Sequence, residues 1–206
     1  MEIDKINIPK ISVIIITYNQ ENFIGRAIES ILREKDYIYE IIISDDCSKD
    51  NNWKIISHYV KKYPQIVRAF RNKYNLGIFK NMERSWEYPT GDIIYELSGD
   101  DEVGKDWFKK SVELIFKNKI DYKNELFCIY GDSKCIYPSG DSITIRNNAI
   151  LKGHKPLKLF LRGLITKRST CFSYRILKKF RKVSKGRSYV VENAQDSQLH
   201  LFVEKS

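Results

Sequence analysis

The sequence predicts an α/β fold: an open, mostly parallel β-sheet with helices on both faces, followed by a small antiparallel lobe. Three observations lead to this prediction. A near-continuous β-branched run over residues 11–17 is typical of a strand buried on both sides of a parallel sheet. Strand-like and helix-like segments alternate through the first 120 residues. After that point, short strand-like segments separated by turns replace the alternation.

Four strands and four helices are expected in the parallel part. We expect the strands at residues 11–17, 38–44, 66–71 and 93–97. We expect the helices at residues 21–33, from 50 or 51 to about 62, from 77 or 79 to 88, and at 105–118. In the first helix, apolar residues recur at i, i+4 and i+8 and form one stripe, and Asn19 is placed to cap its start. Pro64 ends the second helix, and the turn at residues 89–91 ends the third.

The second half of the chain predicts an antiparallel appendage. Strand-like residues 126–130 and 134–137 flank Gly131, Asp132 and Ser133, a combination that predicts a hairpin turn. A second turn at residues 138–141 leads into a further strand at 142–146. Helical patterns are expected at residues 157–161, 174–180 and 194–203.

Length and composition are those of a globular protein with a sizeable core. The chain has 206 residues, of which 42% are hydrophobic and 30% charged, and this length fits one domain. The four cysteines lie far apart and there are only three histidines, which argues against a disulfide scaffold or a zinc site and favours a reduced, cytoplasmic setting. No apolar run is long enough to cross a bilayer, and no signal peptide is visible.

Positive charge is concentrated in the second half. The net charge is +10, yet residues 1–102 carry a net −3 and residues 103–206 a net +13. Residues 142–191 contain 14 Lys and Arg and no Asp or Glu. Such a surface attracts phosphates, nucleic acid or anionic lipid, although a solvated basic face explains the pattern equally well. We therefore expect one domain, residues 1–206, made of two halves that divide after residue 102.

Acidic pairs follow two of the predicted strands. Asp45 and Asp46 follow the second strand, and Asp100 and Asp101 follow the fourth. Ligands of parallel α/β sheets bind outside the carboxyl ends of the strands, so both pairs face one edge. Clustered carboxylates repel each other unless a cation or hydrogen-bond donors lie between them. Oxygen ligands suit Mg²⁺ or Mn²⁺, which substrate phosphates commonly complete. The pattern predicts a metal-diphosphate site, although each pair alone could serve only a turn or a helix cap.

The motifs of residues 10–120 together resemble the inverting family-two glycosyltransferases of bacterial polysaccharide synthesis, which have the GT-A fold. The resemblance is carried, in order, by residues 11–19, 27–32, 39–50, 75–77, 91–92 and 98–101. The first of these segments reads ISVIIITYN, and the last reads SGDD. Each piece is short, and the order and spacing of all of them make the signal specific.

The resemblance implies a role for particular residues. The segment after the first strand lines the base pocket in this family, which here means Thr17, Tyr18 and Asn19. The second acid after the second strand, Asp46, would contact the nucleobase. The acids after the fourth strand would hold the ribose and a divalent metal, Mn²⁺ or Mg²⁺, with Asp100 shared between both and Asp101 a metal ligand. The family motif often begins with an acid where this chain has Ser98. This difference leaves open which residue contacts the ribose.

The family's reaction also needs a proton acceptor. An acceptor hydroxyl attacks the anomeric carbon while the nucleoside diphosphate leaves, and a carboxylate takes the hydroxyl proton. In the family this acid lies late in the chain at a helix start, which Asp196 matches best, with Glu192 as the alternative. The chain ends soon after Asp196, whereas relatives usually continue. We therefore expect either a minimal catalytic domain or a chain shortened at its C-terminus.

The resemblance also implies substrates and a location. The donor would be a nucleoside-diphosphate sugar, with uridine diphosphate favoured, and the acceptor a glycan or a lipid-linked sugar. The basic half would lie beside the acceptor, and it would hold the protein at the cytoplasmic face of the plasma membrane. Two other functions stay open: a nucleotide-binding family member without activity, and a basic nucleic-acid-binding domain. The acidic strand ends argue against the second, because they repel phosphate in the absence of a metal.

Overall fold

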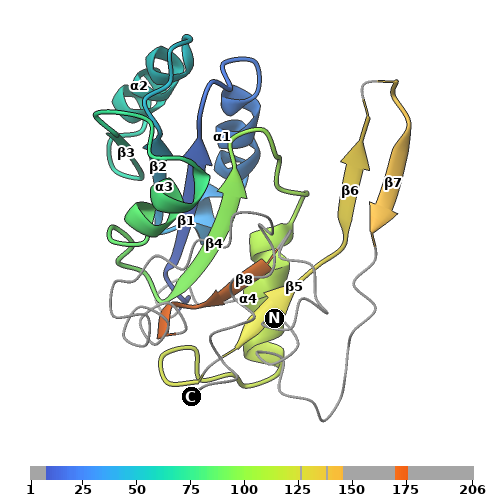
Figure 1. Cartoon of the computed structure of the whole chain (residues 1–206). Coiled ribbons are helices and arrows are strands. Elements are labelled where there is room, and N and C mark those ends of the chain that lie inside the picture. Colours follow the sequence, from blue (N-terminus) through green and yellow to red (C-terminus); the bar gives the residue numbers. More distant parts are fainter. Residues whose placement is uncertain (1–7, 126, 138, 146–169, 176–206) are drawn as a thin grey trace, which may run out of the picture. The chain divides into compact units, whose positions relative to one another are not determined.

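The computed structural model describes residues 8–125, 127–137, 139–145 and 170–175 (Figure 1). The chain divides into two compact units, Met1–Glu125 and Leu126–Ser206, which are described separately below. No helix within the described ranges is both long enough and apolar enough to span a membrane.

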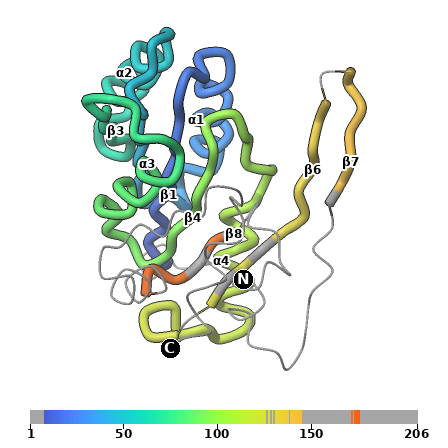
Figure 2. The backbone as a smooth tube through the Cα atoms, viewed as in Figure 1, coloured from blue at the N-terminus to red at the C-terminus, as the bar shows by residue number. Residues whose placement is uncertain are grey.

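The first unit is built on four parallel strands in the order β3-β2-β1-β4. The strands are β1 (Ile11–Thr17), β2 (Glu40–Asp45), β3 (Val67–Arg71) and β4 (Ile93–Ser98). The helices that connect them or follow them are α1 (Ile24–Leu32), α2 (Asn52–Lys62), α3 (Ile78–Ser85) and α4 (Trp107–Lys117). A short 3₁₀ turn, η2 (Lys35–Tyr37), precedes β2. The tube in Figure 2 shows β1 beside β4, although they are far apart in the sequence.

Helices cover both faces of the sheet, as the sequence predicts. Neighbouring residues of a strand point to opposite faces, so the contacts of Ser44 and Asp45 identify the two covers. Ser44 Oγ donates to Asn81 Oδ1 of α3 at 2.7 Å, and Asn52 Nδ2 of α2 donates to Asp45 at 2.8 Å. Helix α4 lies on the same face as α2, because the ring of Tyr95 contacts Trp107 and Phe108 on that side. Strand β2 is therefore buried throughout and β1 at every residue except the half-buried Ile16, which explains their near-continuous isoleucine content.

The amino-terminal edge of the sheet is held by a buried carboxylate. Glu40 Oε1 accepts hydrogen bonds from Ser12 Oγ, Thr90 N and Thr90 Oγ1 at 2.7, 2.7 and 2.9 Å, and Oε2 pairs with Arg68. Burial alone would raise the pKa of Glu40, but the hydrogen bonds from Thr90, Ser12 and Arg68 outweigh it and hold the pKa below its usual value. This network joins β1, β2, β3 and the turn before β4.

The described residues of the second unit form two antiparallel strand pairs. Strand β5 (Cys128–Tyr130) pairs with β8 (Thr170–Ser173), and β6 (Ser133–Ile136) pairs with β7 (Ser142–Ile145). The predicted hairpin about residues 131–133 is therefore wrong. The reversal lies one turn later, where Tyr137 N donates to Asp141 O at 2.9 Å and Gly140 takes a φ of +90°. Among the described glycines only Gly77 and Gly140 have positive φ, so Gly131 does not provide the reversal a tight hairpin needs.

Several helix boundaries differ from those predicted, each for a local reason. Asn19 does not cap α1, because its φ of +52° turns its side chain toward the loop after β2. Helix α1 begins at Ile24, after a turn in which Phe23 N and Ile24 N both donate to Gln20 O. Helix α4 begins at Trp107, because Asp106 is left-handed with a φ of +58°. In the predicted helix 174–180, residues 174 and 175 are helical. Its remainder and the helices predicted at 157–161 and 194–203 lie outside the described residues.

Candidate functional site

The carboxyl ends of the four parallel strands form one edge, as the acid pairs predicted. Thr17 is in register with Asp45, Asp45 with Arg71, and Ile16 with Ser98. The loops that leave these ends therefore start side by side. Residues from the loops after all four strands meet here, which is where parallel α/β sheets bind their ligands.

The loops after β1 and β2 are tied to each other. Asn19 N donates to Ser48 Oγ at 2.9 Å, and Lys49 N donates to Asn19 Oδ1 at 2.7 Å. Further along, Glu21 N donates to Asp50 Oδ2 at 2.9 Å. Asn19 and Cys47 both adopt positive φ, which the two tight turns require. Asn19, expected in the base pocket, thus has its amide oxygen occupied by the neighbouring loop.

Asp45 holds the fold of its own loop. Its carboxylate is fully buried and lies 3.2 Å from Arg71 Nε, and it accepts a hydrogen bond from Asn52 Nδ2 at 2.8 Å. The backbone N and the hydroxyl of Ser48 also donate to it. Asp45 thus stabilises a turn, which is the role that the sequence allowed for each acid pair as the alternative to a metal site. It leaves Asp46 as the member of that pair that faces a cavity.

Asp46 is a buried carboxylate that organises the loop after β3. Its Oδ1 accepts from Asn72 Nδ2 at 2.7 Å and from Leu76 N at 2.8 Å, and its Oδ2 accepts from Gly77 N at 2.9 Å. Only 2% of Asp46 is exposed. Gly77 has a φ of +81°, a conformation that favours glycine and that lets the chain turn from this loop into α3.

Behind Asp46 lies a network of buried amides. Asn72 Nδ2 donates both to Asp46 Oδ1 and to Asn81 Oδ1, the latter at 2.9 Å. Asn81 Oδ1 also accepts from Ser44 Oγ at 2.7 Å, and Asn81 Nδ2 donates to Ser44 O at 3.1 Å. The network connects β2, the end of β3 and α3. It fixes the position of the Asp46 carboxylate, because each amide is held by more than one partner.

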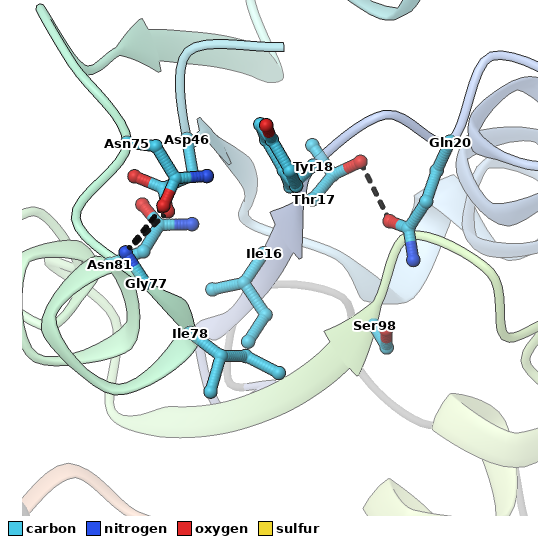
Figure 3. A pocket seen from close by; sticks show the side chains of 10 residues that line it. All are labelled: Ile16, Thr17, Tyr18, Gln20, Asp46, Asn75, Gly77, Ile78, Asn81 and Ser98. Carbon is cyan, nitrogen blue, oxygen red and sulfur yellow. Dashed lines mark hydrogen bonds between the residues drawn. The ribbon is translucent and has the colours of Figure 1, made fainter.

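A cavity of about 360 Å³ opens at this edge (Figure 3), a size typical of small-ligand sites. Asp46, Asn75 and Asn81 lie together on one side of it, with Tyr18 across from them. Tyr18 and Ile78 are large and partly exposed, at 39% and 50%. The complete lining is Ile16, Thr17, Tyr18, Gln20, Asp46, Asn75, Gly77, Ile78, Asn81 and Ser98. A flat polar ring would meet fixed hydrogen-bonding groups on one side and apolar surface elsewhere.

The turn after β4 carries the second acid pair. Gly99 packs against β1, where an added Cβ would lie 2.7 Å from Thr17 Oγ1 and 2.5 Å from Gln20 Oε1. Ser98, which stands where the family often has an acid, donates its hydroxyl proton to Asp100 Oδ1. Asp100 and Asp101 are both exposed.

The donor set of this turn fits a hard divalent cation. Two exposed carboxylates offer oxygen ligands, the type that Mg²⁺ and Mn²⁺ prefer. In the part of the chain that the structure describes, no group of three or more His, Cys, Asp or Glu could hold a metal.

The structure brings together some of the residues expected from the sequence and separates others. Thr17, Tyr18 and Asp46 line the cavity, whereas Asn19 and the Asp100-Asp101 pair are not part of its lining. The expected base Asp196 and its alternative Glu192 lie outside the described residues. Gln20, Ile78 and Asn81 also line the cavity and were not predicted from the sequence. A signal for Asn81 was present, since α3 is amphipathic and places a polar residue on its buried face.

Known proteins share sequence with most of the chain. The sequence model of the family described as "Glycosyl transferase family 2" matches residues 12–183. The chain is 28% identical over 185 residues to "Putative glycosyltransferase EpsE" of Bacillus subtilis, covering 87% of this chain and 63% of that protein.

Solved structures share the fold. One is S. aureus TarS in complex with UDP-GlcNAc, with a TM-score of 0.67 and 18% identity, covering 93% of this chain and 52% of that one. Another is the mannosyltransferase PcManGT of Pyrobaculum calidifontis with GDP-Man and Mn²⁺, with a TM-score of 0.59 and 16% identity, covering 95% and 52%. The chain spans about half the length of these structures. The expected GT-A-like fold is confirmed.

Proposed function

The chain belongs to glycosyl transferase family 2, and on that premise we propose that it is an inverting glycosyltransferase. It moves a sugar from a nucleoside-diphosphate sugar, with uridine diphosphate favoured, to a hydroxyl of a glycan or lipid-linked acceptor. The observation that carries the proposal is the cavity at the carboxyl edge of the parallel sheet, with Asp46 held on its wall. Two solved relatives of this fold were determined with UDP-GlcNAc and with GDP-Man.

The nucleotide is proposed to bind with its base in this cavity and its diphosphate toward the turn after β4. Thr17, Tyr18 and Asp46 contact the nucleoside. Asn19 supports this pocket through the loop that it ties to Lys49. Ser98 lines the cavity and donates to Asp100, so it links the nucleoside pocket to the acid pair.

Asp100 and Asp101 are proposed to hold Mn²⁺ or Mg²⁺, with Asp100 also near the ribose. A divalent ion there would offset the charge of the departing diphosphate as a Lewis acid. The orientation of Asp100 by the Ser98 hydroxyl supports this role, because it fixes one ligand before the substrate arrives. The solved relative PcManGT was determined with Mn²⁺.

The transfer is proposed to be a single displacement. The acceptor oxygen forms a bond to the anomeric carbon, the bond from that carbon to the diphosphate oxygen breaks, and its electron pair leaves with the nucleoside diphosphate. The hydroxyl proton passes to a carboxylate, for which we propose Asp196, with Glu192 as the alternative. The configuration at the anomeric carbon inverts, because attack comes from the side opposite the leaving group.

The basic stretch 142–191 is proposed to border the acceptor and the anionic inner face of the plasma membrane, which would make the protein cytoplasmic and peripherally bound. Each Lys or Arg near such a surface contributes about 1 kcal/mol. Charge reversal at Lys178, Lys179, Arg181 and Lys182 should weaken sedimentation with vesicles that contain about 30% of the anionic lipid phosphatidylglycerol. Donor binding should not change. Unaltered sedimentation would show that the basic stretch 142–191 is only solvent-exposed surface and does not bind the membrane.

The proposed activity is tested by incubating the protein with UDP-sugars and GDP-sugars, with and without Mn²⁺, and measuring release of the nucleoside diphosphate. Metal-dependent hydrolysis supports the transferase. Nucleotide binding without turnover, in the presence of acceptor extracts, would favour an inactive family member, which the Ser98 departure makes the second candidate. Tight, salt-sensitive binding of random oligonucleotides with no nucleotide binding would contradict the proposal.

A further inference from the structure

The wall of the cavity has hydrogen-bonding capacity that the described residues do not use. We infer that Asn81 reads the nucleobase together with Asp46, as a donor and an acceptor side by side, and that the pair selects bases with a ring N–H next to a carbonyl. Uracil and guanine have this pattern, whereas cytosine and adenine have the reverse. The inference rests on the proposed function and identifies a specificity-determining residue within it.

The hydrogen bonds of Asn81 fix which way its amide points. Its Oδ1 accepts from Ser44 Oγ at 2.7 Å and from Asn72 Nδ2 at 2.9 Å, and its Nδ2 donates to Ser44 O at 3.1 Å. A flipped amide would place its NH₂ group against two donors, so the observed orientation is strongly preferred. The amide nitrogen carries two protons and Ser44 O takes one. Asn81 is only 2% exposed and lines the cavity, so a ligand there could accept the second proton.

Asp46 has a matching acceptor. An ionised carboxylate offers about four lone-pair sites, and Asn72 Nδ2, Leu76 N and Gly77 N occupy three of them. Oδ2 accepts from Gly77 N alone among the described residues, which leaves one site. Asn72 Nδ2 bridges the two side chains, so donor and acceptor are neighbours on one wall. Because both are held before any ligand binds, little ordering is needed on binding.

The chemistry of the bases decides which ligand fits. In uracil and guanine, a ring N–H can donate to Asp46 while the adjacent carbonyl accepts from Asn81. When the ribose and diphosphate hold the ring in that same orientation, cytosine and adenine would turn a ring nitrogen lone pair to the carboxylate and an amino group to the amide. Both contacts would then be lost and buried groups would lose partners, which is how polar sites discriminate strongly. Tyr18 and Ile78 in the same cavity offer surfaces for the ring faces (Figure 3).

The test measures dissociation constants by calorimetry, with Mn²⁺ present, for the diphosphates of uridine, guanosine, cytidine and adenosine, and for two analogues of UDP. We expect UDP or GDP to bind at least about tenfold more tightly than CDP and ADP. 3-Methyl-UDP lacks the ring N–H, and 4-thio-UDP replaces a carbonyl oxygen with the weaker acceptor sulfur. Each should weaken binding to the wild-type protein by roughly tenfold.

Variants separate base reading from a merely structural role. In Asn81→Leu, the penalty for 4-thio-UDP should disappear, and the preference for UDP over CDP should shrink but not vanish, because Asp46 still accepts the ring N–H of uracil. Asn81→Asp keeps the acceptor for Ser44 and Asn72 but has no amide protons, so it should weaken discrimination in the same way if the leucine variant does not fold. Asn118→Leu is the matched control. It removes an exposed asparagine that donates to Leu114 O on α4, far from the cavity lining, and should keep the wild-type pattern.

Three results overturn the inference while leaving the proposed function intact. The wild-type protein could bind all four nucleoside diphosphates equally, or it could bind 4-thio-UDP as well as UDP. An Asn81 variant that weakens UDP and CDP by the same factor would likewise reduce Asn81 to a structural residue. Failure of every nucleoside diphosphate to bind would instead contradict the proposed function, and the inference would fall with it.

Discussion

The role of Asp46 in folding the loop over the cavity leads to a quantitative prediction for Asp46→Ala. The substitution removes three hydrogen bonds to a charged acceptor, from Asn72 Nδ2, Leu76 N and Gly77 N, at 2.7, 2.8 and 2.9 Å. Hydrogen bonds to charged groups contribute about 1.5–3 kcal/mol each. A simple total would exceed 4 kcal/mol, but the donors do not all lose every partner.

The remaining partners reduce the expected cost. Gly77 N keeps Asn75 Oδ1 at 3.0 Å, and Asn72 Nδ2 keeps Asn81 Oδ1 at 2.9 Å. Leu76 N is only partly buried and can reach water. We therefore expect the free energy of unfolding to fall by about 2–4 kcal/mol, which corresponds to a melting temperature lowered by about 5–15 °C for a chain of this size.

Urea and thermal denaturation measure the total effect, and amide hydrogen exchange locates it. Exchange of the Leu76 and Gly77 amides should accelerate, while the amides of β1 lose protection only as far as global stability falls. Asp46→Asn keeps the shape and one acceptor oxygen, so its cost should be smaller. A change below about 0.5 kcal/mol for Asp46→Ala, with unaltered exchange at Leu76 and Gly77, would refute this account of the loop.

The other predictions concern the metal, the base and the opposite edge of the sheet. Asp101→Ala should abolish Mn²⁺-dependent binding of UDP, measured by calorimetry. The melting temperature of the variant should stay within about 2 °C of wild type, because the Asp101 side chain is exposed on a turn. Undiminished Mn²⁺-dependent affinity for UDP would exclude Asp101 as a metal ligand. Asp196→Asn should abolish sugar transfer but retain UDP binding. Full transferase activity of this variant would make Glu192 the candidate proton acceptor. Hydrogen bonds hold the pKa of Glu40 below its usual value, so the ionised carboxylate stabilises the folded state at neutral pH, and this contribution is lost as the pH falls through the folded pKa. The free energy of unfolding of Glu40→Gln, measured by urea denaturation between about pH 6 and pH 3, where carboxyl groups titrate, should depend less on pH than that of the wild type. Parallel pH curves for the two proteins would contradict the assignment.

Local pattern determined the elements of the first unit. The alternation of strands and helices, the buried character of β1 and β2, and the placement of polar residues at strand ends all follow from short-range periodicity, and the structure confirms them. The family resemblance was recognisable for the same reason, since its motifs are the strand ends themselves. The resemblance assigned Thr17, Tyr18 and Asp46 to the nucleotide pocket, and all three line the cavity at the edge where parallel strands end.

Pairing between distant segments could not be predicted from the sequence. Residues 131–133 have turn composition, yet β5 does not pair with β6. Strand β5 pairs with β8, about forty residues later in the chain, and β6 pairs with β7. A turn-forming sequence permits a reversal but does not require one. The reversal is decided by which strands gain a partner, and that depends on contacts between parts of the chain that no local window contains.

The same division applies inside the site. The residue pattern alone offered Asp45 and Asp46 as equivalent acids, and the family resemblance singled out Asp46. The tertiary structure supplies the physical reason: Arg71 and Asn52 occupy Asp45, while Asp46 faces the cavity. Neighbouring residues of a strand point to opposite faces, so one step along the chain changes the surroundings completely. Asn81 became part of the site because α3 packs against β2 and turns that residue toward Ser44. The sequence by itself thus determined which residues reach this edge, and the packing of helices on the two faces decided what each of them contacts.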